Sequence, residues 1–196
     1  MAWDTARTKH LLLEAAVEEF AEHGPQGARV ARIATRAGVN KERIYQYFGN
    51  KDQLFTAVLE AELANLATVV PLTGEQAGDL GDYAGRVMDY HRQHPHFLRL
   101  LAWEGLQSGE QDPVVAESLR ARHYADKVAA ITLAQQAGTA TGEVDAAVLM
   151  YAVIALTAAW FTMPQLVRML VTGSSADDPD MQRDALVTLV RRLTSA

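Results

Sequence analysis

The chain has 196 residues, of which 49% are hydrophobic and 21% charged; it contains no cysteine and carries a net charge of −6. This composition is that of an ordinary globular protein, and it excludes global disorder, disulfide bonds, thiolate zinc sites and a cysteine nucleophile. The first apolar run, residues 11–17, is interrupted by Glu14 and does not form a secretory pattern. We therefore expect a cytoplasmic protein.

Charge is distributed unevenly along the chain. Residues 27–52 contain six bases and two acids, a net charge of +4, whereas residues 56–196 contain ten bases and seventeen acids, a net charge of −7. A small basic head on an acidic body suggests that only the head meets a polyanion. The alternative is an ordinary solvated charged face.

Helices account for nearly the whole pattern, because apolar residues recur at spacings of three and four and no segment alternates with period two. A first helix is expected over about residues 4–23, ending at Gly24-Pro25. A short second helix over 30–37 ends at Gly38, and a third over 40–48 follows after a tight turn. Asn50 is a suitable N-cap for a fourth helix that extends to about residue 70.

Further helices are expected over residues 80–93, 95–107 and 113–137, the last opened by Asp112 as cap and Pro113 at its first position. Residues 146–167 contain no charge over 22 positions, a length that meets the criterion for a membrane span. Its threonines, its proline and the lack of preceding positive residues favour a helix buried in a core or against a twin. A final amphipathic helix follows over 180–193. We expect two domains, residues 1–50 and 51–196.

The segment over residues 30–48 predicts a helix-turn-helix head, with the first helix of the chain packed beneath it. The second helix of such a motif enters the DNA major groove. On a helical wheel Ile44 and Phe48 face the core, so the opposite side is free to read DNA. Lysine and arginine there suit guanine edges, and tyrosines flanking that side reach phosphates. The expected DNA contacts are Arg29, Asn40, Lys41, Glu42, Arg43, Tyr45, Gln46, Tyr47 and Lys51.

The residue pattern of this head resembles that of the DNA-binding domain of the TetR family of transcriptional regulators. The anchors of that family are Ile-Ala, Ala-Gly-Val, Tyr-x-Tyr-Phe and Lys-(Asp/Glu)-x-Leu, which stand here at residues 33–34, 37–39, 45–48 and 51–54. The match covers about the first 55 residues. The resemblance implies an all-α fold with a three-helix head and a C-terminal bundle that binds a small molecule. It also implies a homodimer formed by the helices over about 146–171 and 180–193.

Two positions depart from the family pattern. Arg29 stands where a threonine or serine usually caps the second helix, so we expect the cap to come from backbone or water and Arg29 to contact phosphate. Glu42 stands where a small residue is usual. A carboxylate repels phosphate but accepts from cytosine N4, so we hypothesise that Glu42 narrows the operator sequence.

Two further groups of residues could indicate a metal site or a small-molecule pocket, but their patterns are less specific. His91, His94 and His96 invite a metal site, but Pro95 interrupts the helix between them, and a helix-junction role is favoured. A small-molecule pocket in the body would be mostly apolar with a few polar groups. Candidate lining residues are Phe97, Trp103, Glu104, Tyr124, Met150 and Tyr151. No nucleophile, phosphate-binding, zinc-protease or dinucleotide motif occurs, so we expect neither an enzyme nor a cofactor or metal.

The sequence therefore predicts a homodimeric DNA-binding regulator, more specifically a repressor, that a small-molecule effector releases from a pseudo-palindromic operator. One alternative is a DNA-binding protein without an effector. Another is a helical-bundle metal-binding protein that uses His91, His94 and His96.

Overall fold

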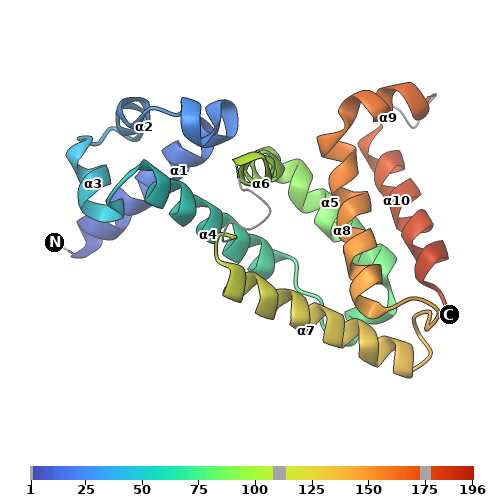
Figure 1. Ribbon diagram of the computed structural model, residues 1–196. Helices are drawn as coiled ribbons and strands as arrows, with labels where there is room; N and C mark the ends of the chain where they lie inside the picture. Colours follow the sequence, from blue (N-terminus) through green and yellow to red (C-terminus); the bar gives the residue numbers. More distant parts are fainter. Residues whose placement is uncertain (1, 108–113, 173–177) are drawn as a thin grey trace. The chain divides into compact units, whose positions relative to one another are not determined.

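The computed structural model describes residues 2–107, 114–172 and 178–196, and every regular element among them is a helix (Figure 1). The all-α prediction is confirmed. In chain order the elements are α1 Ala2–Gly27, α2 Val30–Ala37, α3 Glu42–Phe48, α4 Lys51–Val69, the short 3-10 helix η1 Gln76–Gly78, α5 Leu80–Gln93, α6 Pro95–Gln107, α7 Glu117–Gln136, α8 Ala146–Thr162, α9 Pro164–Leu170 and α10 Pro179–Thr194.

The chain divides into two compact units. We call Met1–Asn65 with His96–Glu117 the N-terminal unit, and Leu66–Pro95 with Ser118–Ala196 the C-terminal unit. The predicted domains, 1–50 and 51–196, follow chain order. The units follow packing instead, so α6 returns to the N-terminal unit and α4 runs from one unit into the other.

The core of the N-terminal unit is built from the apolar stripes of its helices. Leu12, Ala16 and Phe20 recur every four residues on α1 and are fully buried. The phenyl ring of Phe20 meets that of Phe55 on α4 edge-on at 5.1 Å between centroids. Leu100 of α6 joins the same cluster. This core fixes the short helices α2 and α3, which are too short to be stable alone.

Two glycines with positive φ shape the head. Gly24 has a φ of 66° and breaks α1 where the sequence predicted its end, although one more helical turn follows. A Cβ at Gly24 would lie 2.8 Å from the Trp103 ring, so glycine also permits that close contact. Gly38 has a φ of 64° and ends α2, as predicted. Asn50 accepts from the Gln53 N–H at 2.8 Å and caps α4, also as predicted.

Two predicted helix boundaries were wrong. The helix expected from residue 113 begins at Glu117, because Ala116 adopts a φ of 53°, outside the right-handed helical region; Asp112 and Pro113 lie outside the described residues. The helix expected over 146–171 is two helices, α8 and α9, that meet at an angle of 87°. Met163 leaves the helical conformation there because the following Pro164 disfavours it.

In the C-terminal unit α5 packs against α8 and α10 (Figure 1). Gly81 and Gly85 of α5 face α10, and a Cβ at Gly81 would lie 2.7 Å from the Val187 carbonyl oxygen. The two glycines therefore let the helix backbones approach closely. Charged pairs flank this contact, from Arg191 to Asp79 and from Arg183 to Asp89, at 2.7 and 2.8 Å.

No single helix among the described residues has the length and apolarity needed to cross a membrane; α8 and α9 reach that criterion only when taken together, across their sharp bend.

Candidate nucleic-acid interface

The helix α3 is oriented as the helical wheel predicted. Ile44 is fully buried and Phe48 is half-buried against the core of the N-terminal unit. The opposite side carries Glu42, Arg43 and Gln46, all exposed. Asn40 accepts from the Glu42 N–H at 3.4 Å, at the first residue of the helix. The helix α3 therefore has one apolar side that packs on the core and one polar side that faces outward.

All nine predicted DNA contacts lie on the N-terminal unit, and their exposure differs. Tyr47 and Lys51 are half-buried. The exposed members are Arg29, Asn40, Lys41, Glu42, Arg43, Tyr45 and Gln46. Their role in DNA contact stays a prediction.

Side-chain contacts preorganise part of this surface. Arg43 donates to the Gln46 amide oxygen at 2.8 Å, and its guanidinium lies 6.0 Å from the Tyr47 ring centroid. The ammonium of Lys9, on α1, lies 5.6 Å from the same ring. Lys9 is thus a further cation beside α3. Sequence reasoning missed it, because no spacing rule connects residues so far apart in the chain.

Lys51 has a structural role that the sequence did not reveal. Its ammonium donates to the carbonyl oxygens of Gln26 and Ala28 at 3.2 and 3.3 Å. The Gln26 carbonyl lies in the last turn of α1, and the Ala28 carbonyl lies in the segment that joins α1 to α2. Lys51 therefore ties the start of α4 to that segment, and a phosphate contact would have to share the same ammonium.

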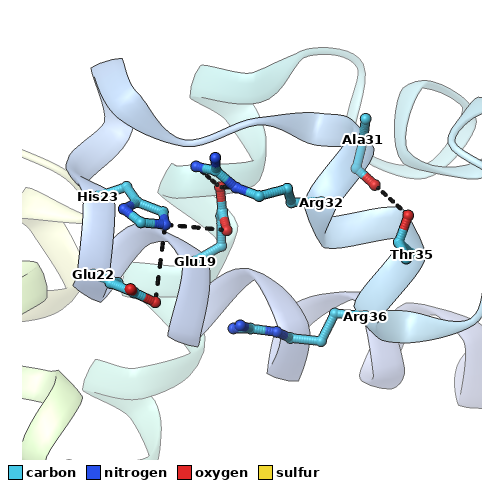
Figure 2. A pocket seen from close by; sticks show the side chains of 7 residues that line it. All are labelled: Glu19, Glu22, His23, Ala31, Arg32, Thr35 and Arg36. Carbon is cyan, nitrogen blue, oxygen red and sulfur yellow. Dashed lines mark hydrogen bonds and ion pairs between the residues drawn. The ribbon is translucent and has the colours of Figure 1, made fainter.

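A buried carboxylate links α1 to α2. Glu19 is 2% exposed and accepts from the Arg32 guanidinium at 2.7 Å (Figure 2). It also accepts from the Arg29 backbone N–H at 2.8 Å. Its second oxygen lies 3.8 Å from the His23 ring nitrogen. Burial raises the pKa of Glu19, but the hydrogen bonds from Arg32 and from the Arg29 backbone outweigh it and lower the pKa.

Glu19 also satisfies the backbone N–H of the N-cap residue of α2. Arg29 occupies the cap position and makes no side-chain cap, as its chemistry predicts. Its N–H is satisfied by Glu19, while its carbonyl oxygen accepts from the Arg32 and Ile33 N–H groups. The Arg29 side chain is left exposed and available to a phosphate.

Ion pairs reduce the number of positive charges in residues 27–52 that remain available to DNA. Arg32 is neutralised by Glu19, and Arg36 pairs with Glu18 at 2.7 Å. Within the described part of the chain, Arg29, Lys41 and Arg43 make no ion pair. The cations still free to meet a polyanion are therefore concentrated at the entry to α2 and on α3.

The six candidate effector-pocket residues fall in both units. Phe97, Trp103 and Glu104 belong to the N-terminal unit; the Trp103 indole N–H donates to the Ala21 carbonyl at 3.4 Å, and Glu104 accepts from the Val115 N–H at 3.1 Å. In the C-terminal unit Met150 is buried, whereas Tyr124 and Tyr151 are 37% and 73% exposed. The pocket assignment stays a prediction.

The three histidines have separate environments. His91 is buried beside the Phe161 ring at 5.7 Å between centroids, and burial, with a smaller contribution from His94, lowers its pKa to about 4. His94 stacks on the Tyr90 ring at 4.0 Å. His96 belongs to the other unit. Across residues 2–107, 114–172 and 178–196 no group of three or more His, Asp or Glu side chains is placed to hold a metal ion.

Comparison with known proteins points to one family. Residues 12–58 match the family model for bacterial regulatory proteins of the tetR family, and residues 79–192 match the model for tetracyclin repressor-like C-terminal domains. The HTH-type transcriptional repressor SCO4008 of Streptomyces coelicolor is 41% identical over 98% of this chain and 97% of its own length. The HTH-type transcriptional repressor NicS of Pseudomonas putida is 36% identical over 53% of this chain and 50% of its own.

A solved structure extends the likeness to the fold. The crystal structure of SCO4942 from Streptomyces coelicolor, described as a transcriptional regulator, superposes with a TM-score of 0.80 at 32% identity. The match covers 95% of this chain and 98% of that one.

Proposed function

Since the chain belongs to the TetR family of bacterial regulatory proteins and is a DNA-binding transcriptional regulator, we propose that it acts in the cytoplasm as a homodimeric repressor whose grip on DNA a small-molecule effector weakens. The relative that is 41% identical along nearly its full length is itself named a repressor, which supports this direction of control. We assign the chain no catalytic activity.

The observation that carries the DNA-binding proposal is the position of α3. Its buried Ile44 and exposed Arg43 and Gln46 support the proposal that the side carrying Arg43 and Gln46 enters the major groove. Lys41 and Arg43 then read base edges, while Arg29 and the tyrosines hold phosphates. Glu42 accepts from a cytosine amino group and so restricts the sequence that is bound.

Dimerisation is supported by exposed apolar side chains on two adjacent helices of the C-terminal unit. On α8 Val148 and Tyr151 are 54% and 73% exposed, and on α10 Leu189 and Leu193 are 46% and 53% exposed. The two helices contact each other (Figure 1). An apolar surface of this kind is the usual core of a homodimer interface. Two heads related by a two-fold axis then read a pseudo-palindrome.

The experiment is selection of bound duplexes from a random DNA pool, followed by affinity against salt on the winning sequence. We expect a palindromic winner whose affinity falls steeply with salt, because phosphate contacts release counterions. Lys41→Ala and Arg43→Ala should weaken binding, and one of them should relax the preference at a single base position. Arg122→Ala, which removes an exposed arginine from α7, is the matched control and should change neither property. A pool without an enriched sequence would contradict the proposal.

A further inference from the structure

Two cations, one buried and one half-buried, lie beside a buried tyrosine in the C-terminal unit. Tyr83 of α5 and Lys127 of α7 are 2% and 4% exposed, and the Lys127 ammonium donates to the Tyr83 hydroxyl at 2.6 Å. The guanidinium of Arg86, one turn along α5, lies 5.5 Å from the centroid of the same ring. Two positive charges therefore converge on a single buried phenol.

Lys127 has no acidic partner among the residues that the structure describes; Tyr83 supplies its hydrogen-bond acceptor there. Burial raises the pKa of Tyr83, so the phenol is neutral and does not compensate the charge. Burial, and then the charge of Arg86, lower the pKa of Lys127 to about 8, which leaves it mostly protonated at neutral pH. An ammonium has three N–H groups, and the phenol takes one of them.

Arg86 also has an unused donor. Its Nε pairs with Asp82 at 2.9 Å and its Nη1 donates to the Pro71 carbonyl oxygen at 2.9 Å. Its Nη2 is buried and has no hydrogen-bond partner in the described part of the chain. Buried polar groups are nearly always satisfied, and a buried charge without a counterion is costly. Arg86 has Asp82 as its counterion, so among the described residues Nη2 lacks only an acceptor, whereas Lys127 lacks a counterion.

The composition of the two helices indicates what kind of anion fits. Besides Tyr83 and Lys127, the buried residues of α5 and α7 are mostly apolar: Leu80, Ala84, Val87, Met88, Ala130, Ile131 and Ala134, together with Tyr90, His91 and two glycines. A carboxylate accepts from both a lysine and an arginine, and an apolar body suits helices whose buried residues are mostly apolar.

We propose that Lys127, Arg86 and Tyr83 form the recognition element for an organic acid, a small carboxylate on an apolar body, and that such an acid is the effector class. The proposal rests on the function proposed above. Lys127 binds the carboxylate together with Arg86 Nη2, and the Tyr83 hydroxyl holds the ammonium in place.

The same arginine offers a connection to the DNA-binding head. Pro71, whose carbonyl oxygen Arg86 holds, follows the end of α4, and α4 continues into the N-terminal unit. A carboxylate bound by both Arg86 and Lys127 competes with the hydrogen bond from Arg86 to the Pro71 carbonyl oxygen. Ligand binding then changes the end of α4, which is the differential contact that effector control requires.

The test measures ligand binding on the full chain without DNA, by calorimetry and by the shift in melting temperature. The probes are octanoate, its neutral analogue 1-octanol, and inorganic phosphate, all at one ionic strength. We expect octanoate to bind wild-type protein and raise its melting temperature more than 1-octanol or phosphate does. Lys127→Met should weaken octanoate binding about tenfold or more, since a charge-assisted hydrogen bond is lost, and should leave 1-octanol binding unchanged.

Arg122→Met is the matched control, because it removes an exposed positive charge from the same helix; it should bind octanoate as wild type does. If Lys127→Met fails to fold, the wild-type comparison of octanoate with 1-octanol still decides, together with Tyr83→Phe, which should weaken octanoate binding and leave 1-octanol binding unchanged, because the hydroxyl that holds the Lys127 ammonium is lost. Equal effects of octanoate and 1-octanol, an equal shift with phosphate, or unchanged octanoate binding in Lys127→Met would each overturn the proposal.

A separate measurement of operator binding distinguishes this inference from the proposed function. If the protein binds its operator but does not bind octanoate, the organic-acid site is contradicted and the proposed regulatory function stands. If octanoate binds in a Lys127-dependent way but does not change the operator complex, the site is supported and its effector role is contradicted.

Discussion

The buried Glu19 carboxylate and the Arg32 guanidinium, 2.7 Å apart, join the first helix of the chain to the first helix of the DNA-binding motif (Figure 2). A single acid thereby fixes the position of α2 and the N–H of Arg29 at its start. This contact uses a positive charge that lies in the basic head and withholds it from DNA.

We expect Glu19→Gln to destabilise the protein by about 1 to 3 kcal/mol, because it weakens hydrogen bonds made by a buried charged group. Denaturant unfolding measures this change. Glu18→Gln, which alters the exposed pair with Arg36, should change stability little. Equal effects of the two substitutions would mean that the buried pair has no special role.

The same pair predicts a pH dependence. The pKa of Glu19 is lowered in the folded chain, so its stabilising contribution is present at neutral pH and is lost as pH falls below the ordinary value of about 4.3 for glutamate. The stability difference between wild type and Glu19→Gln should therefore shrink as the pH falls through this range. Unfolding curves collected from neutral to acidic pH would reveal it.

Lys51 is expected to act on stability as well as on DNA binding. Lys51→Met removes the hydrogen bonds to the Gln26 and Ala28 carbonyls and should cost about 1 kcal/mol. Lys41→Met, at an exposed position, should weaken DNA binding without lowering the melting temperature. A Lys51→Met protein as stable as wild type would show that the carbonyl contacts are dispensable.

The close approach of α5 to α10 depends on glycine. Gly81→Ala would place a Cβ 2.7 Å from the Val187 carbonyl oxygen and should destabilise the protein by about 1 to 3 kcal/mol through overpacking. Gly105→Ala, in α6 with no atom within 4 Å of the added Cβ, should be neutral or stabilising by up to about 1 kcal/mol. Thermal unfolding of both variants tests the contrast.

The dimer proposal predicts that Tyr151→Glu produces a folded monomer, because a carboxylate would be buried in the apolar contact between two copies. Sedimentation measures the mass, and binding to a palindromic duplex should weaken in parallel. Leu133→Glu is the matched control, since Leu133 is 59% exposed on α7, outside the proposed interface. A Tyr151→Glu dimer would place the interface elsewhere.

The head was largely predictable from sequence, because its determinants are local. The spacing of Leu12, Ala16 and Phe20 predicted a buried face, and Gly38 and Asn50 marked helix ends whose chemistry depends only on near neighbours. The family anchors over residues 33–54 supplied the motif. The uncharged run over residues 146–167 predicts one continuous helix, but Pro164 disfavours the helical conformation at Met163, and the run forms two helices.

The sequence by itself determined the helical class, the family and the surface of α3, since periodicity, capping and turn residues act within a few positions of one another. Tertiary structure alone decided which charges remain free: Glu19 meets Arg32, and Lys51 meets Gln26 and Ala28, only after the chain has folded back. It likewise decided that Lys127 is buried beside Tyr83 without an acid. The free energy of a charge depends on the groups that surround it, and residues distant in sequence supply those groups.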